Sequence, residues 1–210
     1  MTHYPDYHRA ARLAYRTLLK LGIDKLPVDI LGICKRCKNT LVMTFRDAEK
    51  EFDLPDGYFI CNGPSESAFT NHRQIGDDLQ NIILYNDDRM DNSVQRMRFS
   101  LAHELGHILL KHEGNSSINE MEANCFAQHL LCPAPLVEAL DFKDDSKIYM
   151  FTSTFGVSRT VARIILGNKQ LMQDVDPDMR QGIRELFRLD EDGIQEIIGS
   201  TFGRLLRRLG

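Results

Sequence analysis

The stretch RFSLAHELGHILL, residues 98–110, decides the fold and the chemistry of this chain. His103 and His107 are separated by one turn if the stretch is an α-helix, so both imidazoles project from the same face. Most of the other positions are apolar, which predicts a helix that is largely buried. Buried polar groups without partners are costly, and a shared metal ion would supply the partner that both histidines need.

The residues His103-Glu104-Leu105-Gly106-His107 form an H-E-x-x-H pattern, which is typical of zinc peptidases when it lies on a helix. Neutral imidazole is a good ligand for Zn²⁺, and His103 and His107 are therefore predicted as two of its ligands. Glu104 lies beside them, close enough to act as general base on a water molecule that the metal activates. A polar surface patch is the simpler alternative for a pair of helical histidines, but the apolar neighbours favour the metal site.

A second stretch, SINEMEANCFAQHLLCP at residues 117–133, follows closely and predicts a helix over 118–131 that ends near the proline. Glu120 and Asn124 are four residues apart and share a face that also carries two alanines. Such small side chains would let this helix approach the first one closely. We interpret Glu120 as the third zinc ligand and Asn124 as a hydrogen-bond partner that orients one of the ligand histidines.

Two alternatives for the third ligand remain open at this level. Ser117 and Glu120 have the spacing of a capping box, in which Glu120 would only satisfy a backbone N–H at the helix start. Glu122 is the other carboxylate within reach, although it lies about 200° around the helix from Glu120. The need of the H-E-x-x-H pair for a third ligand favours Glu120.

Both stretches together resemble the ImmA/IrrE family of metallopeptidases, and the resemblance extends over roughly residues 8–167. The blocks that carry it are RFSLAHELGHILL, EMEANCFAQHLLCP, NIILYN at 81–86 and FGVS at 155–158. The resemblance implies a gluzincin-like site with His103 and His107 as ligands, Glu104 as general base and Glu120 as third ligand. The chain departs from the usual family pattern at His129, where glutamate is common, and at Cys132, where methionine is common.

The resemblance also implies a biological role. Family members are typically cytoplasmic proteins of bacteria or mobile elements that cut helix-turn-helix transcriptional repressors and thereby relieve repression of phage, mobile-element or stress genes. We therefore expect a cytoplasmic zinc endopeptidase that holds one Zn²⁺ per chain and acts on a protein substrate.

The pattern of elements predicts an α+β fold: a zincin-like catalytic domain with a small mixed sheet packed on the active-site helix, followed by a mainly helical C-terminal region. The expected boundaries place the catalytic domain at 1–167 and a helical extension at 168–210. Expected helices cover 7–21, 28–34, 93–112 (capped by Asn92 with Gln95) and 118–131, with later ones beginning at Asp176-Pro177 and covering 192–209; expected strands cover 41–45, 58–61 and 81–86, with a loop over 62–78.

The third expected strand has a possible functional role. In zincins a strand beside the catalytic helix pairs with the substrate backbone, and the resemblance assigns this role to Ile82–Tyr85. Tyr85 is a candidate hydrogen-bond donor to the oxyanion, with His112 and His129 as alternatives. An ordinary core strand is the competing interpretation.

The segment 148–166, within a helix-turn-helix-like closure expected over 145–167, suggests a different function. Arg159 and Arg163 could face a DNA groove from its second helix, and the chain would then be a DNA-binding regulator or a non-catalytic regulator stabilised by metal. Two basic residues are few for such a role, and the remaining positions are mainly apolar. Nucleic acid is therefore not the expected partner.

Composition agrees with these expectations. The chain has 210 residues, a formal net charge of −4 and a pI near 6.0, which gives no general attraction to nucleic acid or anionic membranes. It contains no apolar run long enough to span a bilayer and no signal-peptide pattern, so no membrane partner is expected. Five cysteines, an odd number, favour free thiols in a reducing compartment, and Cys34 and Cys37 lack the further ligands that a zinc knuckle needs.

Overall fold

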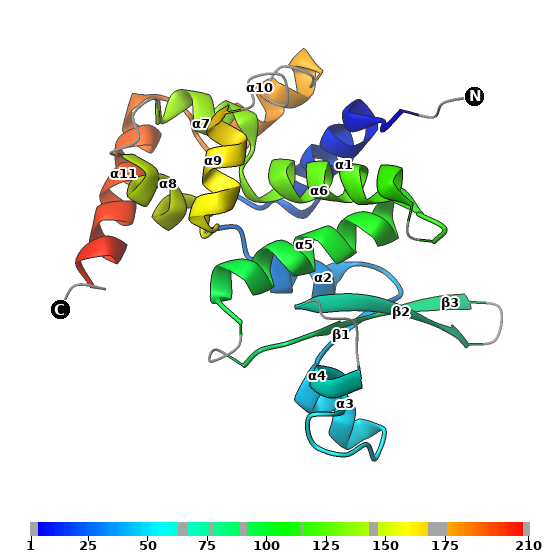
Figure 1. Cartoon of the computed structure of the whole chain (residues 1–210). Helices are drawn as coiled ribbons and strands as arrows, with labels where there is room; N and C mark the ends of the chain where they lie inside the picture. The colour runs from blue at the N-terminus through cyan, green and yellow to red at the C-terminus, as the bar shows by residue number, and fades with distance from the viewer. Residues whose placement is uncertain are drawn as a thin grey trace.

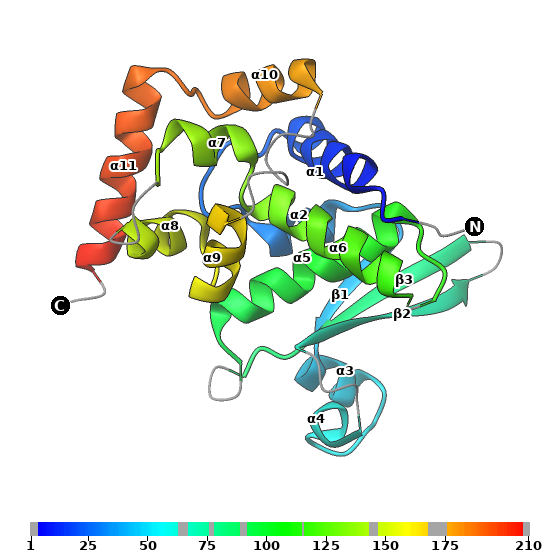
Figure 2. The same cartoon turned by 45° about the horizontal axis from the view of Figure 1, so that its top comes forward.

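The structure is a computed structural model that describes residues 4–62, 67–75, 78–88, 92–114, 116–142, 147–167 and 176–207. Figures 1 and 2 show a small sheet with helices on both faces and a helical region beyond it. The elements are α1 (Tyr7–Leu21), α2 (Ile30–Arg36), β1 (Thr40–Thr44), α3 (Phe45–Glu51), α4 (Tyr58–Asn62), β2 (Ala68–Ile75), β3 (Asp78–Tyr85), α5 (Val94–Leu110), α6 (Ser117–Leu131), α7 (Ala134–Ala139), α8 (Ile148–Phe155), α9 (Arg159–Gly167), α10 (Pro177–Leu186) and α11 (Glu191–Leu206).

The described strands form one mixed sheet in the order β1-β3-β2, which confirms the expected α+β class. β1 runs parallel to β3, with Thr44 opposite Tyr85, and β2 runs antiparallel to it, with Ala68 opposite Tyr85. β3 is therefore paired on both sides, and the prediction that Ile82–Tyr85 binds a substrate strand is wrong. The open edges of the described sheet belong to β1 and β2.

The two faces of the sheet are covered by different helices (Figure 1). Successive side chains of a strand point to opposite faces, and β3 follows this rule. Ile83 and Tyr85 join the main core with α5 and α1, whereas Ile82 and Leu84 join a smaller core with α3. The active-site helix α5 thus lies on one face of the sheet, and α1 and α6 pack beyond it (Figures 1 and 2).

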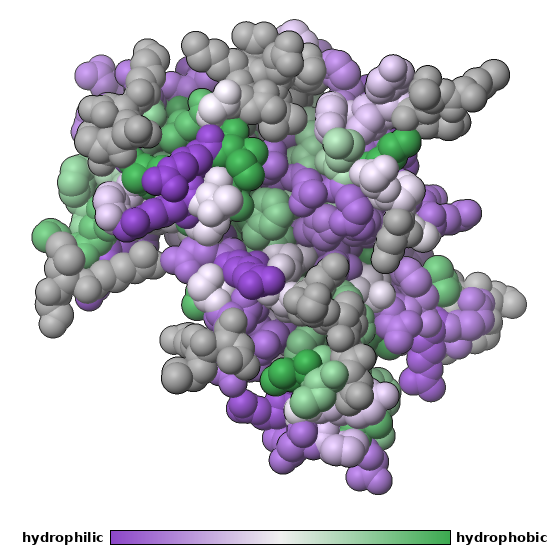
Figure 3. All heavy atoms as spheres, in the orientation of Figure 1, coloured by the Kyte–Doolittle hydropathy of each residue, from purple (hydrophilic) through white to green (hydrophobic). Residues whose placement is uncertain are grey.

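The residues Tyr58–Cys61 were expected to form a strand, and this prediction is wrong because they form the helix α4. The buried carboxylate of Glu49 on α3 accepts hydrogen bonds from the backbone N–H groups of Gly57 (3.0 Å) and Phe59 (3.1 Å). The first N–H groups of a helix have no partner within it, so Glu49 on the preceding helix α3 satisfies these two. Figure 3 shows apolar side chains at the surface of this α3–α4 lobe.

The segment 62–78 was expected to be a loop, and the structure places β2 within it. Its polar sequence hides the strand, because an edge strand exposes one side of its backbone and much of its side-chain surface to water. β2 gains its conformation from the ladder that it forms with β3. This correction matters for function, since β2 contributes a residue to the site.

Most other elements agree with the expectations to within a few residues. α1 ends at Gly22, whose left-handed backbone (φ 61°) closes the helix as expected. α5 begins after Ser93, whose hydroxyl accepts a hydrogen bond from the N–H of Arg96, so the expected cap at Asn92 with Gln95 is not formed. α2 begins at Ile30, two residues later than expected.

The C-terminal helices pack on the rest of the chain. α10 contacts α1 and α7, and α11 contacts α8, where the hydroxyls of Thr154 and Thr201 lie 3.1 Å apart. The start of the expected extension at 168–175, the first residues of the expected closure at 145–146 and the end of the last helix at 208–209 lie outside the described residues. The division at residue 167 stays a prediction. Within the described ranges no helix is both long and apolar enough to cross a membrane.

Candidate metal centre

His103, His107 and Glu120 come together where α5 crosses α6. The Nε2 atoms of His103 and His107 lie 3.0 Å apart. Glu120 places one carboxylate oxygen 3.2 Å from Nε2 of His103 and the other 3.4 Å from Nε2 of His107. The candidate ligand atoms of the three residues all lie within 4.8 Å of one another.

This donor set fits Zn²⁺. Ligands at about 2.0–2.2 Å in a tetrahedral site are separated from one another by about 3.3 Å, close to the observed spacings. Two imidazoles and one carboxylate also form a set that zinc peptidases use, with a fourth position left for water or substrate. The histidine side chains are 14% exposed and that of Glu120 is 44% exposed, so the cluster is open to solvent on the side of Glu120.

The close approach of α5 and α6 depends on small residues. A side chain at Gly106 would place its Cβ 3.0 Å from the ring of Phe126 and 3.3 Å from the backbone of Ala123. Gly106 on α5 and Ala123 on α6 thus let the helices meet closely enough for their side chains to share one ion. The expectation that alanines on α6 permit this approach is confirmed at Ala123.

The start of α6 bears on the alternatives for the third ligand. Ser116, not Ser117, caps this helix and accepts the N–H of Asn119 at 3.1 Å, so the capping box of Ser117 with Glu120 is not formed. The side chain of Asn119 donates to the carbonyl of Gly114 at 2.8 Å, which links the start of α6 to the connection that follows α5. Glu120 is left facing the two histidines.

The predicted base, Glu104, is 7% exposed and lies one residue after His103. The hydroxyl of Thr70 on β2 donates to its Oε2 at 2.7 Å. Sequence reasoning missed Thr70 because it assigned the whole of 62–78 to a loop. The contact fixes the carboxylate in one orientation beside the cluster.

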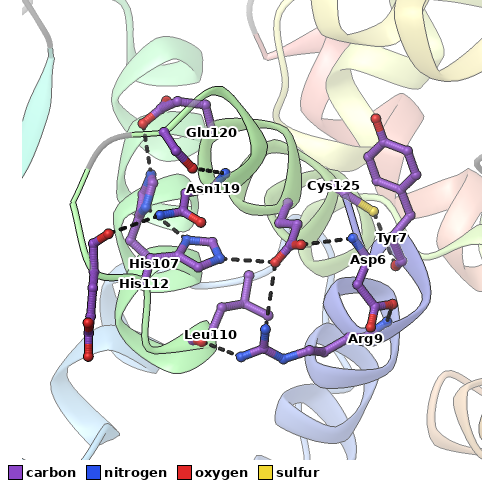
Figure 4. Close-up of polar contacts among 12 residues, drawn as sticks. Asp6, Tyr7, Arg9, His107, Leu110, His112, Asn119, Glu120 and Cys125 are labelled. Atoms are coloured by element: carbon purple, nitrogen blue, oxygen red, sulfur yellow. Dashed lines mark hydrogen bonds and ion pairs between the residues drawn. The ribbon is translucent and has the colours of Figure 1, made fainter. Parts of the chain in front are cut away.

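The two histidines are oriented by different partners. Nδ1 of His103 lies 3.0 Å from Oδ1 of Asn124, as expected. Nδ1 of His107 lies 3.0 Å from Nδ1 of His112, a partner that was not expected (Figure 4). Burial, together with the neighbouring His103 and His112, lowers the pKa of His107 to about 4. His107 is therefore neutral at pH 7, which is the form that binds a metal.

The partner of His103 indicates which of its ring nitrogens faces the cluster as an acceptor. An amide oxygen only accepts, so the ring nitrogen of His103 that faces Asn124 carries the hydrogen and Nε2 offers a lone pair. The carboxylate of Glu120 likewise only accepts. Bare acceptors at 3.2 Å repel one another unless a cation lies between them.

The other predicted residues lie elsewhere. Tyr85 is buried at the end of β3, burial raises its pKa, and no hydrogen bond joins it to the cluster in the described part of the chain. Its role toward the oxyanion stays a prediction. His112 is turned inward, and His129 packs in the core with its ring 5.6 Å from that of Tyr15, so the structure places neither on the open side of the cluster.

The cysteines form no second centre. All five are free, and Cys34 and Cys132 are buried, which raises the pKa of both thiols. Cys34 lies in α2 and Cys37 caps its end, as the simpler interpretation of this pair predicted. Among the described residues, the only group of three or more side chains able to hold a metal is that of His103, His107 and Glu120.

Comparison with known proteins agrees with this geometry. Residues 63–166 match the family model Peptidase_M78, described as the IrrE N-terminal-like domain. This range contains Thr70, Glu104 and all three candidate ligands. Searches of curated proteins and of solved structures gave no significant match. Residues 63–166 are an IrrE N-terminal-like domain of the Peptidase_M78 family of metallopeptidases, and this domain carries the candidate His-His-Glu metal site.

Proposed function

We propose that this chain is a zinc-dependent endopeptidase in which His103, His107 and Glu120 hold the metal and Glu104 is the general base. The observation that carries the proposal is the convergence of two imidazole nitrogens and a carboxylate, with N···O distances of 3.2 Å and 3.4 Å, beside the buried carboxylate of Glu104. When bound, a zinc ion would polarise the scissile carbonyl and make a nearby water more acidic.

The residues of the chain supply the remaining steps. Glu104 takes the proton of the attacking water and passes it to the leaving amine. Thr70 holds one oxygen of Glu104 through its hydroxyl, so the other oxygen is presented in a constant direction. Asn124 and His112 keep the histidine rings turned with Nε2 toward the cluster.

The open edge of β2 is the proposed binding surface for the substrate backbone. β2 is an edge strand of the described sheet, and it contributes Thr70 to the site from the same strand. An extended peptide that adds to this edge would run past Glu104 and the cluster. This position replaces the one that the sequence suggested on β3.

We further propose a helix-turn-helix repressor as the substrate, in the cytoplasm of a bacterium. The support for this identity is the resemblance to the ImmA/IrrE family. Membership of a peptidase family supports only the broader statement that the substrate is a protein.

The test compares wild type with Glu104→Gln. Both proteins are purified, their zinc content is quantified, and each is co-expressed with a helix-turn-helix repressor encoded beside its gene. The intact mass of the repressor is then followed. We expect about one zinc ion per chain in both proteins and a cleavage rate at least about 100-fold lower in the variant.

Glu113→Gln is the matched control, because Glu113 is an exposed glutamate just beyond α5. It is expected to bind zinc and to cleave like wild type. Absence of zinc from the wild type would refute the metal site. Zinc in the wild type with an intact repressor would refute the proposed substrate and leave the metal site standing.

A further inference from the structure

We propose that His112 and Glu122 are positioning residues that aim His107 at the metal, and that the N-terminus of α1 holds Glu122 in place. This inference rests on the proposed function, since it concerns one ligand of the same metal site. It gives both side chains a role other than the one that the sequence suggested. His112 was a candidate for contact with the oxyanion, and Glu122 was an alternative third ligand.

His107, His112 and Glu122 form a relay of polar contacts that begins at the ring of His107. Its Nδ1 lies 3.0 Å from Nδ1 of His112, and Nε2 of His112 lies 3.1 Å from Oε2 of Glu122 (Figure 4). The side chains of His112 and Glu122 are only 5% and 8% exposed, so water does not substitute for these contacts. Three residues thus form a continuous chain of polar contacts behind the metal cluster.

The proton positions along this chain follow from Glu122. A carboxylate only accepts, so Nε2 of His112 is its donor and Nδ1 of a neutral His112 becomes an acceptor. Nδ1 of His107 then donates to His112, which leaves the lone pair of Nε2 on His107 for the metal. Each hydrogen bond in this series sets the direction of the next one. The result is a single tautomer and a single ring orientation for His107.

Glu122 is itself held by a distant part of the chain. Its Oε1 accepts the backbone N–H of Asp6 at 2.8 Å, and the guanidinium of Arg9 lies 3.8 Å from its Oε2. Arg9 also donates to the carbonyl of Leu110, the last residue of α5 (Figure 4). The start of α1 therefore connects α5 and α6 directly behind His107.

His103 provides an internal contrast. Its Nδ1 has the side chain of Asn124, which lies on α6 four residues from Glu120. The partner of His103 thus comes with the third ligand on one helix. The partner of His107 instead depends on a loop residue, on a second face of α6 and on residues more than a hundred positions away.

The test measures zinc affinity by competition with a chelator, without reference to cleavage. His112→Phe keeps a ring but removes both nitrogens, and we expect a dissociation constant about 10- to 100-fold higher. His112→Asn keeps an acceptor near the position of Nδ1 and is expected to recover most of the affinity. Glu122→Gln removes the anionic acceptor at nearly constant volume and is expected to weaken binding about 10-fold.

Glu49→Gln is the matched control, because Glu49 is a second buried carboxylate that accepts two backbone N–H groups. It is expected to lower the thermal midpoint of the apo protein and to leave zinc affinity unchanged. A merely structural role for Glu122 would give the same result as Glu49→Gln, with lower stability and unchanged affinity.

The outcomes separate this inference from the proposed function. Tight zinc binding by wild type, His112→Phe and Glu122→Gln alike would overturn the relay and leave the peptidase proposal intact. Failure of the wild type to bind zinc would overturn both. If His112→Phe does not fold, Glu122→Gln and His112→Asn decide between the relay and a structural role by the same affinity measurement.

Discussion

The pairs α5–α6 and α8–α9 are both helices joined by a short connection, yet only the first pair carries reactive side chains. In α5–α6 the facing surfaces bring His103, His107 and Glu120 together. Gly106, which has no side chain, lets α5 lie close to α6 at this point. The polar groups point toward one another and toward the open side of the site. The apolar residues of both helices pack against the sheet and α1.

In α8–α9 the buried surfaces are mainly apolar, and the charged groups of α9 point outward. Phe151, Phe155 and Ile165 are buried in the main core, whereas Arg163 is exposed. The guanidinium of Arg159 lies 4.2 Å from the ring centre of Tyr149, a cation–π contact within the pair itself. The side chain of Arg98 from α5 donates to the carbonyl of Gly156 at 3.0 Å and fixes the turn between the two helices.

The difference shows how the same local motif serves two purposes. A helix pair with a small residue at its crossing point brings polar side chains into one cluster. A helix pair whose buried residues are mainly apolar builds core and leaves its charges on the surface.

The largest effect is expected from Gly106→Val. The added side chain meets Phe126 and the backbone of Ala123, so α5 and α6 must separate. We expect the free energy of unfolding of the apo protein to fall by about 2 kcal/mol. Zinc affinity should fall as well, because Glu120 moves away from the histidines. Denaturant titration and chelator competition measure the two quantities.

Gly199→Val is the control for this substitution, because a Cβ at Gly199 on α11 meets nothing within 4 Å. It should leave zinc affinity unchanged and stability nearly so. Equal zinc affinity in Gly106→Val and wild type would contradict the role that we give to the close approach of the helices.

A smaller effect is expected from Thr70→Val, which removes the hydroxyl that holds Glu104 and keeps the shape of the side chain. A hydrogen bond to a charged group contributes about 1.5 kcal/mol, so kcat/KM should fall about 10-fold. Zinc content should not change, since Thr70 does not touch the ligands. Thr40→Val on β1 is the control, because its hydroxyl binds only the carbonyl of Lys38 among the described residues. Wild-type kcat/KM in Thr70→Val would show that Glu104 needs no such support.

The smallest effect is expected from the double change Arg159→Ala and Arg163→Ala. Binding to a mixed-sequence DNA duplex, followed by fluorescence anisotropy at low and moderate salt, should be weak and should change less than about 2-fold. Arg184→Ala, an exposed arginine on α10, serves as the control. Strong salt-dependent binding that only the double variant loses would restore the DNA-binding alternative for the α8–α9 pair.

The candidate metal site was largely predictable because most of its residues lie close together in the sequence. The spacing of His103 and His107 is set by the geometry of one helix, and Glu120 follows on the next helix with Asn124 on the same face. The strand β1 and the helix α1 were predictable for the same reason, since hydrophobic periodicity and a terminal glycine are visible in the chain itself.

The predictions were wrong where contacts between different elements decide the local structure. The short apolar run Tyr58–Cys61 suits a strand or a helix, and the carboxylate of Glu49 on the preceding helix α3 stabilises the helix. β2 has a polar sequence and becomes a strand through its ladder with β3. That same ladder makes β3 a central strand and moves the open edge to β2.

The sequence by itself therefore determined the family, the candidate ligands and the proposed base, because those residues are related by the fixed periodicity of single helices. Only the tertiary structure decided the surroundings of these residues. Thr70 reaches Glu104 from a strand, and Asp6 and Arg9 reach Glu122 from the far end of the chain. Contacts between residues so far apart depend on how helices and sheet pack, and local sequence patterns do not contain that information.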